Sequence, residues 1–288
     1  MRITNLMIQM DLTAGLRQRL AAIAKASNQA ATGLRISTIS DDPVDATQIM
    51  QMQSQVSDMN QYKRNGTMAT TKLSTEDVAI SSLLDNLTNL RKLAVSTTSA
   101  DPNDPTRKAA LAEANQLKSQ IVALGNTRVG DQYLFGGDAS TTPPFGADGS
   151  YTGTLAVQQI EINNGVTMTV NHAGQPLFTD AISAVNNMIT QLQGGTPDAI
   201  GLAATQINQA VDTAQAMQSE VGSRLQDIQQ QASQLASQSS ALLDRRDALM
   251  NVDSTTAIVT LQAQQNALQQ AYAVVGRVLQ NSLVDYLK

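Results

Sequence analysis

The clearest pattern in the sequence is a regular spacing of apolar residues between Ile207 and Leu249. Apolar side chains recur there in steps of four and three, and only Gln218, Ser239 and Arg246 interrupt the series. A repeat of 3.5 residues kept over about six heptads is typical of a long helix with one narrow apolar stripe. The spacing therefore predicts a long helix that packs against partner helices.

Both ends of the chain carry a similar stripe. One runs through the first 23 residues, and another starts at Leu261, after the polar segment 251–254, which can cap a new helix. Two helices of roughly 30 residues with such narrow stripes are marginally stable as a pair. We therefore expect an antiparallel coiled coil that neighbouring subunits complete. The candidate assembly residues are Ile3, Leu6, Met10, Leu20, Ile23, Leu261, Leu268, Tyr272, Val275, Leu279 and Leu283.

The region between the ends combines further helices with a different centre. Apolar stripes predict one helix from Ala46 to Leu73, a further helix from Ile80 to Ala94, and another from Ala110 to Leu124. Glycine and proline gather in residues 130–178, where "QQIEINNGVTMTV" at 158–170 alternates apolar and polar residues around an Asn-Gly pair. This alternation predicts a β-hairpin.

Helices on both sides of a β-rich centre bring the chain back to the end at which it started. The predicted fold is therefore mainly α, with an antiparallel terminal coiled coil, a long helical rod and a small β-rich insert. We expect residues 1–40 and 252–288 to form the terminal assembly domain. Residues 41–130 and 178–251 would form the rod, and residues 131–177 the outer insert.

The segment "ATGLRISTISDDPVDA", residues 31–46, joins the first two predicted helices. Gly33 is suited to the left-handed conformation that ends a helix. Asp42 is suited to cap the next helix, with Pro43 at its first position and Asp45 in its first turn. A plain connection between two helices explains these residues without a binding role.

Composition excludes several classes of function. The chain has no cysteine, which excludes disulfides and thiolate chemistry, and only 3% of its residues are aromatic. Its net charge of -5 and the absence of a basic run argue against nucleic-acid binding. Its apolar runs are far shorter than the roughly 20 residues that span a bilayer, so we expect no membrane insertion. The first residues lack the apolar core of a cleaved signal peptide.

No catalytic, cofactor or metal site is predicted. His172 is the only histidine, and we expect it to be a solvent-exposed turn residue. Asp41 and Asp42 are adjacent, so their side chains should diverge, and capping explains Asp42. Gly136 and Gly137 are not followed by the lysine of a phosphate-binding loop. The candidate anchors of the insert on the rod are Tyr133, Leu134 and Phe135.

Three motifs resemble the bacterial flagellin superfamily. They are "TGLRI" with "DDP" in residues 32–43, "GDQYLFGGDASTTPPF" in residues 130–145 and "NSLVDYLK" in residues 281–288. The first and last resemble the two ends of that superfamily. The proline after the paired aspartates, together with the middle motif, resembles its hook–filament junction family. The signature residues are Gly33, Leu34, Arg35, Asp41, Asp42 and Pro43.

This resemblance implies a flagellin-like structural subunit that forms a ring of copies between the first hook-associated protein and flagellin. It also implies type III export without a cleaved leader, and a cytosolic export chaperone that holds the C-terminal helix before assembly. Two alternatives stay open from the sequence. One is a short flagellin that forms the filament itself, and the other is a helical binding module of the cytosol.

Overall fold

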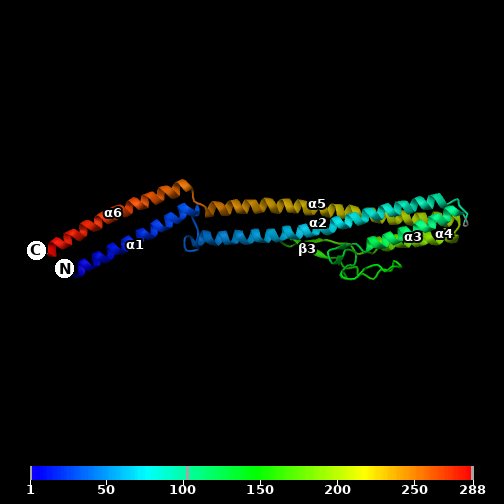
Figure 1. Cartoon of the computed structure of the whole chain (residues 1–288), viewed down its shortest axis with the longest axis horizontal. Helices are drawn as coiled ribbons and strands as arrows, with labels where there is room; N and C mark the ends of the chain where they lie inside the picture. The colour runs from blue at the N-terminus through cyan, green and yellow to red at the C-terminus, as the bar shows by residue number, and fades with distance from the viewer. Residues whose placement is uncertain (1, 102–103, 287–288) are drawn as a thin grey trace. The chain divides into compact units, whose positions relative to one another are not determined.

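The computed structural model describes residues 2–101 and 104–286 of the chain, with side chains described for residue 7 and for residues 10–101 and 104–277. These residues form the helices α1 (Arg2–Thr32), α2 (Pro43–Thr97), α3 (Pro105–Gly125), α4 (Leu177–Gly194), α5 (Pro197–Met250) and α6 (Ser254–Tyr286) (Figure 1). Four short strands lie between α3 and α4: β1 (Arg128–Val129), β2 (Gln132–Tyr133), β3 (Gln159–Asn163) and β4 (Val166–Thr169). The predicted fold class, mainly helical with a small β insert, is confirmed.

The chain divides into two compact units. The first contains Met1–Ser57 and Gln238–Lys288, and the second contains Asp58–Ser237. Both boundaries fall inside long helices, because α2 and α5 each contribute residues to both units. The division into three parts that the sequence suggests stays a prediction.

In the first unit, α1 and α6 lie side by side and antiparallel, so the start of α1 is beside the end of α6 (Figure 1). The predicted break before α6 is confirmed, since α5 ends at Met250 and α6 begins at Ser254. Asp253 caps α6 by accepting a hydrogen bond from the Thr256 amide at 2.9 Å. A small apolar cluster of Ile36, Ala46 and Ile49, with Leu249 and Met250 packed on it, lies at the other end of the pair.

The second unit contains the main hydrophobic core. Its largest part comes from α2 and α5, and α3 packs on α4 to complete it. Most of the apolar stripe predicted on α5 is buried from Ile207 to Leu235, and its members Leu225 and Ala232 are half-buried. The helix α3 begins as its sequence suggests, with Asp104 accepting a hydrogen bond from the Thr106 amide at 2.7 Å and Pro105 in the first turn.

The predicted break between Leu73 and Ile80 is wrong, because α2 is one continuous helix of 55 residues. The apolar stripe lapses over the polar stretch Ser74–Asp77. The helix continues through this polar stretch, and its residue Glu76 is buried against another polar residue of the core.

The predicted β-hairpin is confirmed. Strands β3 and β4 pair antiparallel, with Ile160 opposite Met168, and a bulge lies between Glu161 and Asn163. Gly165 in the turn has a φ of +70°, a conformation that glycine adopts without steric cost.

Candidate assembly surface

The terminal helix pair, α1 with α6, leaves most of its apolar side chains accessible. Of the side chains described in these two helices, only Ala26 and Ala257 are buried. Small residues at these positions allow the two backbones to approach closely. A pair whose fully buried described side chains are two alanines, while residues such as Ile23 and Leu261 are half-buried, has only a small core of its own.

The structure places the predicted assembly residues in two groups. Ile23, Leu261, Leu268 and Val275 are half-buried. Met10, Leu20 and Tyr272 are 60%, 47% and 52% exposed. The side chains of the remaining predicted residues lie outside the described part of the structure: Ile3, Leu6, Leu279 and Leu283.

Further apolar side chains extend this surface beyond the predicted set. Met7 on α1 and Ile258, Val259 and Val274 on α6 are all more than half exposed. Complete burial of a side chain of this size contributes about 1.5–3 kcal/mol. A neighbouring helix that covers several of them would therefore gain substantial binding free energy.

The signature segment lies at the base of this helix pair and crosses to the other half of the chain. Gly33 has a φ of +72°, so it ends α1 in the left-handed conformation that the sequence predicts. Its carbonyl accepts a hydrogen bond from the Val252 amide at 2.9 Å, and the Arg35 amide donates to Met250 at 2.7 Å. Leu34 forms an antiparallel bridge with Asn251. Residues 33–36, here called the strap, thus bind the connection between α5 and α6.

The side chain of Arg35 holds the strap in place. Its Nε and Nη2 atoms donate to the Leu249 carbonyl at 3.1 and 2.8 Å. Its Nη1 atom lies 3.3 Å from Asp42 Oδ2, and Nη2 also pairs with Asp45. The planar guanidinium therefore links the C-terminus of α5 to the N-terminus of α2. Sequence reasoning did not foresee this role, because Leu249 is 214 residues away.

The two adjacent carboxylates point to different partners, as predicted. Asp42 caps α2 by accepting hydrogen bonds from the amides of Val44 and Asp45, both at 3.2 Å. The bond from the Asp45 amide is the largest cause that lowers the pKa of Asp42, and Arg35 adds to it. Pro43 occupies the first position of α2.

Asp41 closes the turn that precedes this cap. Its Oδ2 accepts hydrogen bonds from the amides of Ser37 and Thr38 at 3.1 and 3.0 Å. Its Oδ1 lies 2.9 Å from Lys25 Nζ of α1. The Lys25 ammonium, followed by the two amides, holds the pKa of Asp41 well below its usual range.

The predicted anchor residues of the insert lie at the edge of the core in the second unit. Leu134 and Phe135 are buried, and Tyr133 is half-buried with the Arg128 guanidinium 5.1 Å from its ring centre. Phe135 packs edge-on against Phe178 of α4 with ring centres 4.6 Å apart. Phe145 packs on the same ring at 5.7 Å, so the three phenylalanines of the chain form one cluster.

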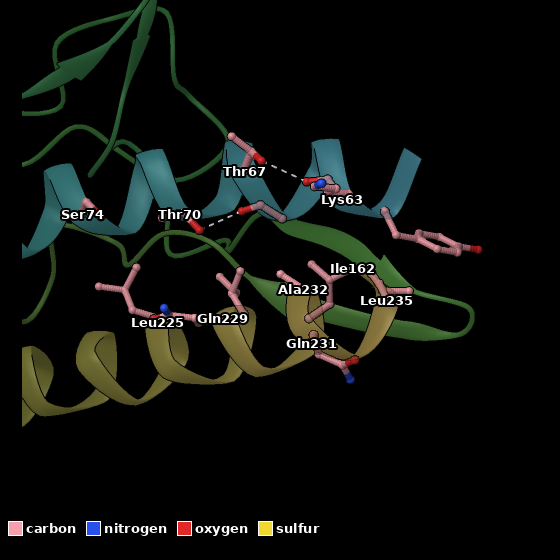
Figure 2. A pocket seen from close by; sticks show the side chains of 13 residues that line it. Lys63, Thr67, Thr70, Ser74, Ile162, Leu225, Gln229, Gln231, Ala232 and Leu235 are labelled. Carbon is pink, nitrogen blue, oxygen red and sulfur yellow. Dashed lines mark hydrogen bonds between the residues drawn. The ribbon is translucent and has the colours of Figure 1, made fainter. Parts of the chain in front are cut away.

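The hairpin makes a second attachment that sequence reasoning missed. Ile162 of β3 is 2% exposed and points into a groove between α2 and α5, as Figure 2 shows. Asn65 of α2 donates to the Glu161 carbonyl at 2.7 Å, and Arg224 of α5 donates to the Thr169 carbonyl at 3.4 Å. The alternation of the strand identifies Ile162 as an inward side chain, but not the helices that receive it.

The expectation for His172 is wrong. The imidazole is 8% exposed, and its Nδ1 atom lies 2.6 Å from Oε1 of the buried Glu76. The turn-like sequence around His172 gives no sign of this burial, because the partner is 96 residues away on α2.

Two negative findings apply to the described residues. They contain no group of three or more histidine, cysteine, aspartate or glutamate side chains that could hold a metal ion. Within the same residues, no helix combines the length and the apolar character needed to span a membrane.

Comparison with known proteins supports the resemblance read from the motifs. Residues 3–140 match the family model of the bacterial flagellin N-terminal helical region. The chain is 26% identical over 197 residues to flagellar hook-associated protein 3 of Escherichia coli, covering 68% of this chain and 61% of that protein. It is also 26% identical over 185 residues to the Salmonella typhimurium protein of the same name, covering 64% and 58%. The aligned region thus spans about three fifths of these relatives.

Solved structures agree with this comparison. The crystal structure of Bacillus cereus FlgL has a TM-score of 0.63 and 25% sequence identity, and the match covers 68% of this chain and 99% of that one. A putative flagellar hook-associated protein from Vibrio parahaemolyticus has a TM-score of 0.68 at 16% identity, with 73% and 100% covered, and shows the shared fold. The resemblance to flagellar hook-associated protein 3 and the flagellin superfamily is therefore confirmed.

Proposed function

We propose that this protein is a structural subunit of the bacterial flagellum and joins the hook to the flagellin filament. The names and folds of its relatives support this proposal. The observation that carries it is the terminal helix pair, which buries only Ala26 and Ala257 among its described side chains. Such a pair gains most of its apolar burial from neighbouring subunits, as a component of a helical assembly requires.

In this proposal the three parts of the chain have separate roles. Residues 1–40 and 252–288 form the assembly domain, with the predicted apolar residues of α1 and α6 in its interface. Residues 41–130 and 178–251 form the rod, and residues 131–177 form a short outer insert. Copies of the chain form a ring whose two faces contact the first hook-associated protein and flagellin.

The exposed apolar face of α6 also supports an export chaperone as a partner. This face needs cover in the cytosol before assembly, since a large exposed apolar patch promotes aggregation. We propose that a cytosolic chaperone covers it until type III export delivers the chain to the extracellular end of the flagellum. The protein then acts by packing and carries out no catalysis.

Deletion of the gene tests the proposal. Electron microscopy of the deletion strain should show hooks without filaments, and flagellin monomers should accumulate in the medium. Filaments of normal length on the mutant cells would contradict the proposal. Growth of long filaments from the purified chain alone would instead support the alternative of a short flagellin.

A matched pair of variants tests the assembly surface in the same strain. Val274→Asp places a charge on an exposed apolar position of α6, and Gln269→Asp places the same charge on another side of that helix. We expect the first to lose filament rescue and the second to keep it. Equal rescue by both would remove this face from the assembly interface.

A further inference from the structure

A buried polar contact joins the insert to two helices of the second unit. His172 lies in residues 170–174, all of which are buried, between β4 and α4. Its Nδ1 atom is 2.6 Å from Glu76 Oε1 of α2, and its Nε2 atom is 3.4 Å from Glu220 Oε2 of α5. One imidazole from the insert therefore hydrogen-bonds to Glu76 through Nδ1 and makes a longer charge contact, without a hydrogen bond, to Glu220 through Nε2.

The protonation state of this imidazole decides how many of its contacts are favourable. Only an imidazolium carries a proton on both ring nitrogens, whereas a neutral ring presents a lone pair to one of the two carboxylates. Glu76 is fully buried, and its Oε2 atom has no hydrogen-bond partner among the described residues. An unpaired charge at such a position lowers the stability of the fold, so the positive charge of His172 stabilises it.

The positively charged side chains of α5 and α2 determine the net charge of this group. On α5, Arg224 pairs with Glu220 one turn away. On α2, Lys72 donates to Gln132 and Gln158 and is thus engaged elsewhere. With His172 protonated, its charge and that of Arg224 balance the two carboxylates. Loss of the proton leaves this group, in which Glu76 and His172 are buried and Glu220 is half exposed, with one net negative charge.

We propose that Glu76, His172 and Glu220 form a proton-dependent clamp that holds the β insert to α2 and α5. The clamp is closed while His172 is protonated and weakens when His172 loses its proton. The insert keeps its apolar attachments through Ile162 and the phenylalanine cluster, so loss of the proton loosens the insert without unfolding the helices.

The direction of the pH dependence follows from the surroundings of His172. Burial is the largest single influence and lowers its pKa, and Arg224 also lowers it. The hydrogen bond and charge of Glu76, together with Glu220, outweigh both and raise the pKa above 6.5. A raised pKa in the closed state means that the clamp contributes fully below the pKa of an exposed histidine. This contribution is lost as the pH rises through the pKa of the closed state.

The chain offers a direct measurement, because His172 is its only histidine. In a protein labelled at histidine, the imidazole NMR signal belongs to His172 without further assignment. We expect its titration midpoint to lie above 6.5 in the wild type and to fall in Glu76→Gln, which keeps the size of the side chain but removes its charge. A wild-type midpoint at or below 6.5 would overturn the clamp.

Hydrogen exchange measures the consequence for the insert. After correction for intrinsic exchange, the opening constant of residues 159–174 should rise with pH in the wild type. Each unit by which the NMR midpoint exceeds 6.5 predicts about a tenfold rise. His172→Gln should remove this dependence, and Glu113→Gln, at an exposed position of α3, should keep it. A pH-independent opening constant in the wild type would refute the proposal even if both clamp variants fail to fold.

Discussion

The terminal helix pair and the core of the second unit are both helical, yet they bury very different amounts of apolar surface. The helix α4 has 18 residues and eight buried side chains, including Phe178 and Met188. The helix α1 has 31 residues, and among its described side chains only Ala26 is buried. The core helices share enough apolar contacts to fold as one unit, whereas the apolar contacts of α1 and α6 are mostly with each other.

The two regions also differ in what fixes their geometry. In the core, apolar side chains of α2, α3, α4 and α5 interlock around residues such as Leu87 and Ile207. In the terminal unit, the strap is held by backbone hydrogen bonds and by the side chain of Arg35, and Asp41 and Asp42 hold the turn and the helix start that follow it. Polar contacts fix the connections at one end of α1 and α6, and the apolar side chains of these helices stay accessible. This arrangement is suited to packing against neighbouring subunits.

A matched pair of leucine substitutions should separate the two regions most strongly. Leu87 is fully buried in the core, so Leu87→Ala should lower the free energy of unfolding of the second unit by about 2–5 kcal/mol. Leu20 is half exposed, so Leu20→Ala should change the stability of the isolated chain by less than about 0.5 kcal/mol. Denaturant unfolding measures both. A large loss from Leu20→Ala would mean that the terminal pair already has a core.

Substitution of Arg35 tests whether charged groups hold the terminal unit. Arg35→Lys keeps the charge but cannot reproduce the forked contacts to Leu249 and the two aspartates, so it should cost about 1.5 kcal/mol. Hydrogen exchange of the Arg35 and Val252 amides should accelerate by about tenfold. Arg17→Lys, at an exposed position of α1, is the control and should leave both amides unchanged.

Gly15 inside α1 and Gly33, which directly follows that helix, should respond to alanine with opposite signs. Gly33 has a positive φ, so Gly33→Ala should destabilise the end of α1 by about 1 kcal/mol. Gly15 lies inside the helix with open space around it, so Gly15→Ala should stabilise α1 by about 0.5–1 kcal/mol. Hydrogen exchange along α1 measures the two effects in one experiment. Stabilisation by both substitutions would contradict the left-handed conformation at Gly33.

The smallest expected effect is a pH dependence of the turn at residues 37–41, which follows the strap. The pKa of Asp41 is lowered by Lys25 and the amides of Ser37 and Thr38, so its contribution is complete above the ordinary value of 3.8. This contribution is lost as the pH falls below that value, and Asp41→Asn should remove the dependence. The protection of the Thr38 amide reports the change. The turn at residues 37–41 thus weakens as the pH falls below 3.8, whereas the clamp weakens as the pH rises through the pKa of His172.

Much of this contrast could be predicted from the sequence, because helix ends depend on local residues. Gly33, Asp42 and Pro43 mark the end of one helix and the start of the next through their own backbone preferences. The narrow apolar spacing at the two ends likewise predicts a helix pair with little core. These features need no knowledge of distant partners.

The features that the sequence did not predict depend on partners far away in the chain. Glu76 lies in a polar stretch of α2, and its carboxylate is buried against His172, which is 96 residues away in the sequence. The same distance hides the burial of His172. Nothing in the local sequence distinguishes Arg35 from the other arginines. Its contact with the Leu249 carbonyl forms because folding brings the end of α5 next to the end of α1. Such pairings are set by tertiary structure and leave no periodic signal.

Hydrogen exchange on the isolated full-length chain in dilute solution tests the central claim most directly. The amides of α1 and α6 should exchange at least about a hundredfold faster than those around Leu87 in α2, because the terminal pair buries so little apolar surface. On incorporation into flagella, the same amides should become as slow as those of the core. Equally slow exchange of α1, α6 and the core in the lone molecule would contradict the account.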